Sequence, residues 1–424
     1  MTKDLPLHVD TDPALWQDFL ELCDFGGRLA GSPSEIMARE WAAGRFSAIE
    51  GGKLSRQPTP YVGWQCSKAD VTLPSGETLE TTPLLCCAAT PPSGLEIEVV
   101  DCGRGTPDDI HAAGPHLRGR AALVRHEYMF SEHTVHRRVK LKAAIDAGAA
   151  AFLIAAPEQG LGAVSGSSGL AATQGANIPA LGISAEAASK IIATPGGRIR
   201  IDIAAEFQPD TKTETLILDL PGLTSERVVL SAHIDGHATG ESALDNATGV
   251  ALALALARTT ARYKPALPRG LTVCLFSAEE WALTGSKVWL SGLPHQEREN
   301  LVFNLNLDTV TGGSRLTALT SGFRELGAFV QQAAVSVGAQ IGVHSRLMPN
   351  SDHANFAALG IPALRLVSGF NEPDSKIRFL LTQRDRRGLV AREDFTEPMR
   401  VAWAVLRAAL TAPLDRLINL RATQ

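Results

Sequence analysis

The chain has 424 residues, a length that predicts two or three domains, each large enough for its own hydrophobic core. Hydrophobic residues make up 45% and charged residues 20%, which excludes an intrinsically disordered chain and a small disulfide-stapled module. The 40 Lys and Arg residues against 45 Asp and Glu give a net charge of −5, so we expect no nucleic-acid partner.

The N-terminal segment is polar and acidic and lacks the apolar core of a signal peptide. The sequence also contains no run of about 18 apolar residues, the length that a membrane-spanning helix needs. Six cysteines show no regular spacing, so we interpret them as reduced thiols. We therefore expect a mature chain without a removed leader, no membrane partner and a cytoplasmic location.

Four apolar runs predict the buried strands of a mixed, largely parallel sheet sandwiched by helices in an α/β fold. These runs are residues 228–232, 271–276, 301–307 and 361–367. Residues 246–258 are mostly Ala, Leu and Val, with an Asp just before them. This pattern predicts a capped, fully buried helix that connects the first two strands.

Residues 93–209 differ from the rest of the chain in their sequence pattern. They contain their own short apolar runs at 121–125 and 150–155, a helical segment that ends at 146–149, and a loop rich in Gly and Ser. Pro, Gly and Asp residues at both ends of the segment are typical of linkers. We therefore expect a β-rich inserted domain at 93–209, with residues 10–92 and 210–424 together forming the main domain.

Side chains that bind metals follow three of the four predicted strands. They are His233 and Asp235 after the first strand, Glu279 and Glu280 after the second, and Asp308 after the third. In open α/β sheets, ligands bind beyond the carboxyl ends of the strands, so we expect these side chains to converge. Asp245, at the start of the predicted helix, lies near the same edge. One His with Asp and Glu carboxylates is a ligand set that zinc accepts.

The spacing within each pair indicates a role for each residue. His233 and Asp235 lie two residues apart on one side of an extended chain, where the carboxylate can orient the imidazole. The adjacent Glu279 and Glu280 point in different directions, so one can bind a metal while the other acts as general base. Taken singly, each of these residues has an ordinary structural role, such as a helix cap.

The surroundings of these residues resemble the signature motifs of the co-catalytic zinc aminopeptidase family, which includes bacterial leucyl aminopeptidase and glutamate carboxypeptidase II. The matching stretches are residues 27–33, 232–235, 242–249, 276–280, 285–286, 306–308 and 351–353. Residues 117–125, 143–151 and 178–184 resemble the protease-associated (PA) domain that this family often carries. The resemblance implies a zinc exopeptidase fold with an inserted PA domain.

The resemblance also implies the ligands of two metal ions. Asp245 would bridge both ions, His233 and Asp308 would complete the first site, and Glu280 would belong to the second. Glu279 would be the general base, and Asp235 would be the carboxylate that orients His233.

The sequence departs from the family at the last ligand of the second site. The family places a His there, in a His-Thr-x-x-Asp pattern, whereas residues 381–385 read Leu-Thr-Gln-Arg-Asp and no His follows His353. Asp245 and Glu280 alone should bind a metal weakly, so we expect one tightly bound zinc and a second metal that is weak or absent. Manganese and cobalt are alternatives to zinc. Candidates for a borrowed ligand are His237, His353, His133 and His136.

These features predict a metal-dependent hydrolase of amide bonds, either an exopeptidase or an amidase, acting on small peptides or N-acyl amino acids. Arg346 and Arg365 have the chemistry to anchor a substrate carboxylate, although surface or ion-pair roles are favoured. The insert would shape the cleft or a homo-oligomer. Two alternatives stay open: a non-catalytic scaffold such as the transferrin receptor, and an acyltransferase similar to glutaminyl cyclase. The presence of Glu279 disfavours the first alternative, and the broken ligand set disfavours the second.

Overall fold

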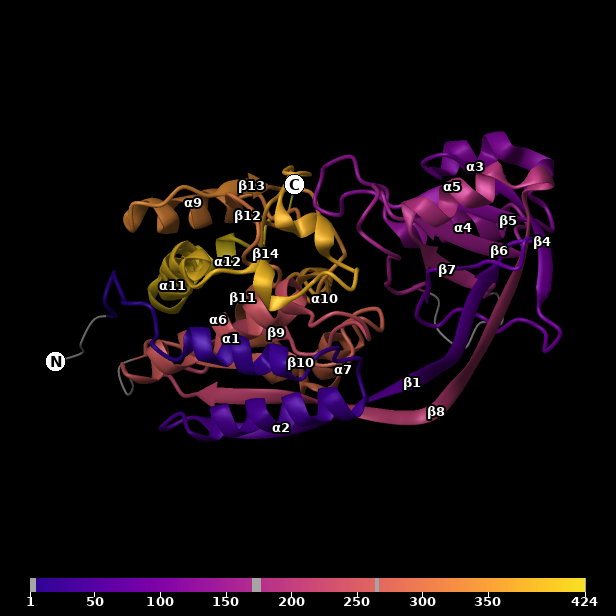
Figure 1. Ribbon diagram of the computed structural model, residues 1–424. Helices are drawn as coiled ribbons and strands as arrows, with labels where there is room; N and C mark the ends of the chain where they lie inside the picture. Colours follow the sequence, from indigo (N-terminus) through magenta and orange to yellow (C-terminus); the bar gives the residue numbers. More distant parts are fainter. Residues whose placement is uncertain (1–4, 170–176, 264–266, 424) are drawn as a thin grey trace. The chain divides into compact units, whose positions relative to one another are not determined.

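The computed structural model describes residues 5–169, 177–263 and 267–423, and the chain divides into two compact units (Figure 1). The first unit comprises Met1–Pro60, Lys212–Ile377 and Asp385–Gln424. The second comprises Tyr61–Thr211 and Arg378–Arg384. The candidate site residues 233–308 therefore all belong to the first unit.

A largely parallel sheet forms the centre of the first unit, in the order β13-β12-β14-β11-β9-β10-β8. Its strands are β8 (Arg198–Leu220), β9 (Arg227–His233), β10 (Gly270–Phe276), β11 (Leu301–Leu307), β12 (Leu316–Leu319), β13 (Gly342–His344) and β14 (Ala363–Ser368). The four neighbours β14, β11, β9 and β10 run parallel, whereas β12 and β8 pair antiparallel to β14 and β10. These four central strands are the ones that the apolar runs predict, and every residue in them is buried except Arg227.

Helices flank this sheet. They are α1 (Leu15–Asp24), α2 (Pro33–Ser47), α6 (Thr248–Ala261), α7 (Thr284–Gly292), α8 (His295–Glu299), α9 (Leu326–Ser336), α10 (His353–Ala358), α11 (Thr396–Thr411) and α12 (Leu414–Asn419). The predicted buried helix is α6, which contacts β9 and β11 as well as α1 and α11. It begins at Thr248 rather than at residue 246, and the predicted side-chain cap is absent, since Ala247 occupies the N-cap position. Other elements surround this helix, so Ala, Leu and Val side chains occupy all of its faces.

Part of the core lies beside the candidate site, where three aromatic rings pack together. The ring centroid of Phe276, the last residue of β10, lies 5.9 Å from that of Trp289 in α7 and 6.3 Å from that of Phe356 in α10. All three side chains are at most 4% exposed, and they pack with Val229 of β9. This cluster fixes α7 and α10 against the ends of the strands that carry the site.

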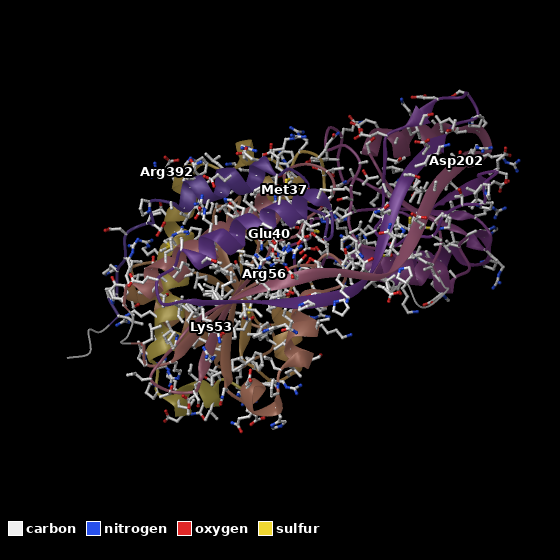
Figure 2. All side chains as sticks on the ribbon, turned by 90° about the horizontal axis from the view of Figure 1, so that it is seen from below. Met37, Glu40, Lys53, Arg56, Asp202 and Arg392 are labelled. Atoms are coloured by element: carbon white, nitrogen blue, oxygen red, sulfur yellow. The ribbon has the colours of Figure 1, made fainter. Side chains whose placement is uncertain are left out.

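Two long strands, β1 (Lys53–Thr72) and β8, run from the first unit into the second. At its start β1 is tied to α2, because Arg56 forms a two-pronged ion pair with Glu40, at 2.5 Å and 2.8 Å (Figure 2). Both side chains are well exposed to solvent, so this pair contributes less than about 1 kcal/mol to stability. The direction of β1 depends mainly on its pairing with β8.

The second unit contains further strands besides its parts of β1 and β8. They are β2 (Thr78–Leu79), β3 (Thr81–Pro83), β4 (Leu95–Asp101), β5 (Ala121–Arg125), β6 (Ala151–Ala155) and β7 (Ala180–Ile183). The strands β4, β5, β6 and β7 run parallel. Helix α3 (Pro107–Ala113) lies between β4 and β5, α4 (Arg137–Asp146) lies between β5 and β6, and α5 (Ala185–Ala193) follows β7. This unit begins at Tyr61 rather than at the expected residue 93, because β2 pairs with β1 and β3 pairs with β7.

Within the described ranges of the chain, no helix combines the length and the hydrophobicity needed to cross a lipid bilayer.

Replacing Phe356 with Ala should lower the free energy of unfolding by about 3–5 kcal/mol, because the change leaves a cavity between β10, α7 and α10. The matched control is Ile418→Ala on α12, where the side chain is 50% exposed and the change should cost less than about 1 kcal/mol. Urea unfolding followed by tryptophan fluorescence measures both. Equal destabilisation by the two variants would show that the aromatic cluster is not a core of the first unit.

Candidate metal centre

The candidate site lies at the carboxyl edge of the central sheet. His233 ends β9 and stands level with Phe276 at the end of β10, while Ser231 of β9 stands level with Asn306 of β11. Because these neighbouring strands run parallel, the residues after them emerge at one edge. The structure therefore gathers His233, the segment 279–280 and Asp308 there, and it places Asp245 at the same edge just before α6.

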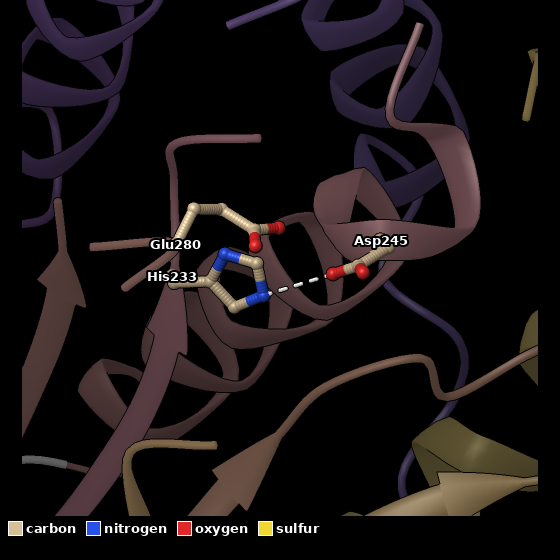
Figure 3. Close-up of side chains that lie close together, drawn as sticks. All are labelled: His233, Asp245 and Glu280. Atoms are coloured by element: carbon tan, nitrogen blue, oxygen red, sulfur yellow. Dashed lines mark ion pairs between the residues drawn. The ribbon is translucent and has the colours of Figure 1, made fainter. Parts of the chain in front are cut away.

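His233 is the centre of this group (Figure 3). Its Nε2 lies 3.0 Å from Oδ1 of Asp245 and 3.6 Å from Oδ1 of Asp308. Its Nδ1 lies 3.1 Å from the main-chain oxygen of Asp235, to which it donates a hydrogen bond when it carries the ring proton. In that tautomer the lone pair of Nε2 faces the two carboxylates, as a metal-binding imidazole requires.

Two sets of side chains bring their ligand atoms within 4.8 Å of one another. One set is His233, Asp245 and Glu280, and the other is His233, Glu279 and Asp308. The expected ligands and the expected base therefore lie close together, with His233 common to both sets. Neither set is one of the expected sites, because Glu280 joins His233 and Asp245, and Glu279 joins His233 and Asp308. One imidazole nitrogen among carboxylate oxygens is a donor set that fits zinc.

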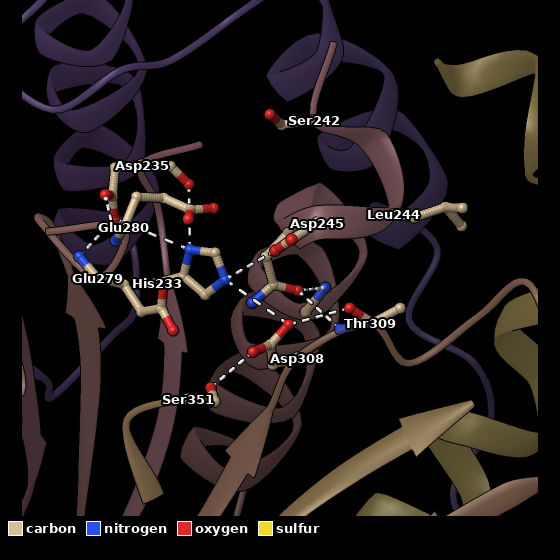
Figure 4. A network of polar contacts seen from close by, with 12 residues as sticks. His233, Asp235, Ser242, Leu244, Asp245, Glu279, Glu280, Asp308, Thr309 and Ser351 are labelled. Carbon is tan, nitrogen blue, oxygen red and sulfur yellow. Dashed lines mark hydrogen bonds and ion pairs between the residues drawn. The ribbon is translucent and has the colours of Figure 1, made fainter. Parts of the chain in front are cut away.

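Asp235 is completely buried and holds the main chain of both glutamates (Figure 4). Its Oδ1 accepts a hydrogen bond from the main-chain N–H of Glu279 at 3.1 Å, and its Oδ2 accepts one from that of Glu280 at 3.2 Å. The carboxylate lies 3.8 Å from Nδ1 of His233, farther than the carbonyl oxygen of the same residue. Asp235 thus positions the two glutamates and, through its main chain, the imidazole.

Three donors fix the carboxylate of Asp308. The Ser351 hydroxyl donates to Oδ2 at 2.6 Å, the Thr309 hydroxyl donates to Oδ1 at 3.0 Å, and Nη2 of Arg365 lies 3.0 Å from Oδ1. Burial raises the pKa of Asp308, but the charges of Arg365 and His233 outweigh it and hold the pKa below its usual range. Arg365 is 3% exposed and has the ion-pair role that the sequence favours, whereas Arg346 is exposed.

A second carboxylate fixes the loop that carries Asp245. Oδ1 of Asp385 accepts a hydrogen bond from the main-chain N–H of Leu244 at 2.8 Å, and Oδ2 accepts one from that of Asp245 at 3.2 Å. Burial raises the pKa of Asp385 to about 7. Sequence reasoning assigned no role to Asp385, although it is the Asp at the end of the family-like pattern at 381–385.

Arg28 and Asn246 complete this support. The guanidinium of Arg28, which is fully buried, donates to the main-chain oxygens of Ile234, Glu241 and Ser242 at 3.1, 2.7 and 3.0 Å. The Asn246 amide donates to the main-chain oxygen of Leu307 at 2.9 Å. Arg28 and Asn246 both lie in the stretches that resemble the family motifs, and this position was the only signal of their roles.

Glu279 has the electrostatic properties of a general base. Burial raises its pKa well above the ordinary value, the charge of His233 opposes this shift, and the charge of Glu280 adds to it. A carboxylate with a raised pKa accepts a proton near neutral pH better than an ordinary glutamate does.

Of the candidate replacement ligands, His237 contacts one of the site residues. Its Nε2 lies 2.8 Å from Oε1 of Glu280. His133 and His136 belong to the second unit, where Nδ1 of His136 accepts a hydrogen bond from the main-chain N–H of Arg138. Among the described residues, neither donor set includes His237 or His353, and His353 is fully buried at the start of α10. Leu381 is also buried, and its main-chain oxygen accepts a hydrogen bond from Ser165.

Asp385→Asn should weaken metal binding about 10-fold to 100-fold, because an amide group offers one acceptor atom to the two N–H groups that fix Asp245. The control is Asp394→Asn, since Asp394 accepts a main-chain hydrogen bond from Ala391 in a separate turn. Equilibrium dialysis with metal analysis measures both affinities. An unchanged affinity in Asp385→Asn would show that the loop needs no such anchor.

His353→Leu should change the pH dependence of stability. Burial, with the nearby charge of Arg365, lowers the pKa of His353 to about 3, whereas an unfolded His titrates near 6.5. The unfolded chain therefore binds more protons as the pH falls, and this costs the wild type stability that the Leu variant keeps. Between about pH 7.5 and about pH 5.5 the variant should gain about 1 kcal/mol relative to the wild type, as measured by urea unfolding. A gap independent of pH would contradict the buried neutral imidazole.

Comparison with known proteins identifies both parts of the chain. Residues 215–395 match peptidase family M28, and residues 85–191 match the PA domain. The fold is that of a zinc aminopeptidase from Bacillus subtilis, with a TM-score of 0.75 over 97% of this chain and 98% of the other at 20% identity. The peptidase M28 precursor of Shewanella amazonensis gives a TM-score of 0.77 over 94% and 93% at 22% identity.

Curated relatives match over shorter stretches. Leupeptin-inactivating enzyme 1 of Streptomyces exfoliatus is 30% identical over 166 residues, which cover 36% of this chain and 35% of that protein. A vacuolar membrane protease of Schizosaccharomyces japonicus is 38% identical over 88 residues, which cover 21% of this chain and 10% of the relative. The match thus spans about a third of the length of the first relative and a tenth of the length of the second. The expected resemblance and the expected fold are confirmed: residues 215–395 match peptidase family M28, residues 85–191 match the PA domain, and the fold is that of the similar solved structures.

Proposed function

We propose that the protein is a zinc-dependent exopeptidase or amidase that hydrolyses an amide bond in small peptides or N-acyl amino acids. The observation that carries this proposal is the pairing of a buried Glu279, whose pKa is raised, with the donor atoms of His233 and Asp308. A base beside a metal-binding imidazole is the arrangement that hydrolysis by an activated water needs.

His233, Asp245 and Asp308 would hold the tightly bound zinc ion. A zinc ion bound there supplies a Lewis acid that polarises the substrate carbonyl and makes a water molecule more acidic. The carboxylate of Glu279 takes the proton of the attacking water and passes it to the leaving amine. Asp235 keeps Glu279 in place through the hydrogen bond from its main-chain N–H, and Arg365 keeps Asp308 ionised.

The relatives support a peptide substrate. The solved structures of similar fold include aminopeptidases, and one curated relative inactivates leupeptin, according to their names. The choice between an exopeptidase and an amidase depends on which end of the substrate is held. Zinc is our proposal for the metal, with manganese or cobalt as alternatives for a site rich in carboxylates.

The alternative of a non-catalytic scaffold agrees less well with the geometry. A scaffold has no need for a buried acidic side chain with a raised pKa, and burying such a group without a compensating interaction is costly. Glu279, His233 and Asp308 nevertheless lie together with their supporting hydrogen bonds.

The composition further supports our proposal of a cytoplasmic protein, and the six cysteines have no disulfide partner in the structure.

Glu279→Gln should lower turnover about 100-fold or more and leave the tightly bound metal in place, because the amide keeps the size of the side chain but cannot accept the proton. The control is Glu299→Gln on the exposed helix α8. Turnover is measured with aminoacyl, dipeptide and N-acyl substrates, and metal content by elemental analysis. Near-normal turnover in Glu279→Gln would exclude Glu279 as the base. Failure of the wild type to cleave any of these substrates would favour a scaffold.

A further inference from the structure

We propose that His237 replaces the missing C-terminal histidine, so that His237, Glu280 and Asp245 hold a second metal ion more weakly than the first ion is held. This inference rests on the proposed function, because the second ion would lie beside the first at the same sheet edge. The proposed ligand, His237, lies outside the pattern at residues 381–385, in which the family has its histidine.

The contact between His237 and Glu280 is the first observation. Nε2 of His237 lies 2.8 Å from Oε1 of Glu280, and the two residues are only 4% and 6% exposed. Glu280 also belongs to the donor set that contains His233 and Asp245. The carboxylate of Glu280 therefore lies near two imidazoles, those of His233 and His237.

The main chain around His237 is the second observation. The N–H of His237 donates to the Ser242 hydroxyl at 3.1 Å, and the N–H of the preceding Gly236 donates to the main-chain oxygen of Arg28 at 2.8 Å. A Cβ atom on Gly236 would lie 2.3 Å from the same Ser242 hydroxyl oxygen, so only glycine permits this approach. His237 is thus fixed to Ser242, which starts the loop that carries Asp245.

The chemistry of the donors supports a metal rather than a hydrogen bond alone. Asp245 and Glu280 supply two oxygen ligands, fewer than the three protein ligands of a typical catalytic zinc site. The imidazole of His237 raises the number to three and supplies the nitrogen that zinc favours over additional carboxylates. A bound cation would also compensate the negative charges of two buried carboxylates that share one imidazole.

The test is a metal titration of the full-length protein, with Zn²⁺ followed by isothermal calorimetry and Co²⁺ followed by its visible absorption. The wild type should bind one ion tightly and a second more weakly. His237→Ala should weaken the second ion at least about 10-fold and leave the first unchanged, because only two protein ligands remain at the second site. The Co²⁺ spectrum of the second ion should change, since it reports the loss of a nitrogen ligand.

His295→Ala is the matched control, because His295 also lies beside a glutamate, 3.8 Å from Glu299, but on an exposed helix. Both ions should bind to this variant as they bind to the wild type. His237→Gln tests whether a side chain of similar size can replace the ligand, and it should lose the second ion as His237→Ala does. Thermal unfolding of each variant shows whether it is folded.

Three results would overturn the inference. They are a wild type that binds a single ion at saturating metal, a second ion that binds equally well to His237→Ala, and a second ion restored fully by His237→Gln. If any of these occurred while the wild type still cleaved its substrates, His237 would only position Glu280 and the proposed hydrolase would stand. If no ion bound and no substrate were cleaved, the proposed function itself would fail.

Discussion

The crowding of buried carboxylates around one imidazole is the constraint on which the site depends. Asp235, Asp245, Glu279, Glu280 and Asp308 are all at most 9% exposed. Burial alone lowers the pKa of His233, but the charges of Glu279 and Asp308 outweigh this effect and raise it well above the ordinary value. Burying so many negative groups is costly unless positive charge compensates them, and a bound cation would supply that charge.

The rest of the fold makes this crowding tolerable by holding two of the carboxylates with donors and by fixing the loop that carries a third. Main-chain N–H groups bind Asp235, hydroxyl groups and Arg365 bind Asp308, and Asp385 fixes the loop of Asp245. Each donor comes from an element that the aromatic cluster or the central sheet keeps in place. Supporting interactions of this kind set the orientation of metal ligands and the affinity for the metal.

The inserted unit depends on a different principle. The long strands β1 and β8 each contribute residues to both units. The expected boundary at residue 93 followed the composition of the linkers, whereas the pairing of β3 with β7 brings residues 81–83 into the second unit. Strand pairing between segments far apart in sequence cannot be inferred from local composition.

The sequence by itself determined the class of the fold, the four central strands, the buried helix α6 and the residues that converge at the sheet edge. It did so because apolar periodicity is a local property, and because parallel strands place their ends at one edge. Only the tertiary structure decided that the carbonyl rather than the carboxylate of Asp235 receives the hydrogen bond of His233. It alone also brought Asp385 to Asp245 and His237 to Glu280. These contacts depend on side-chain directions and on loop closure over many residues, which no local pattern encodes.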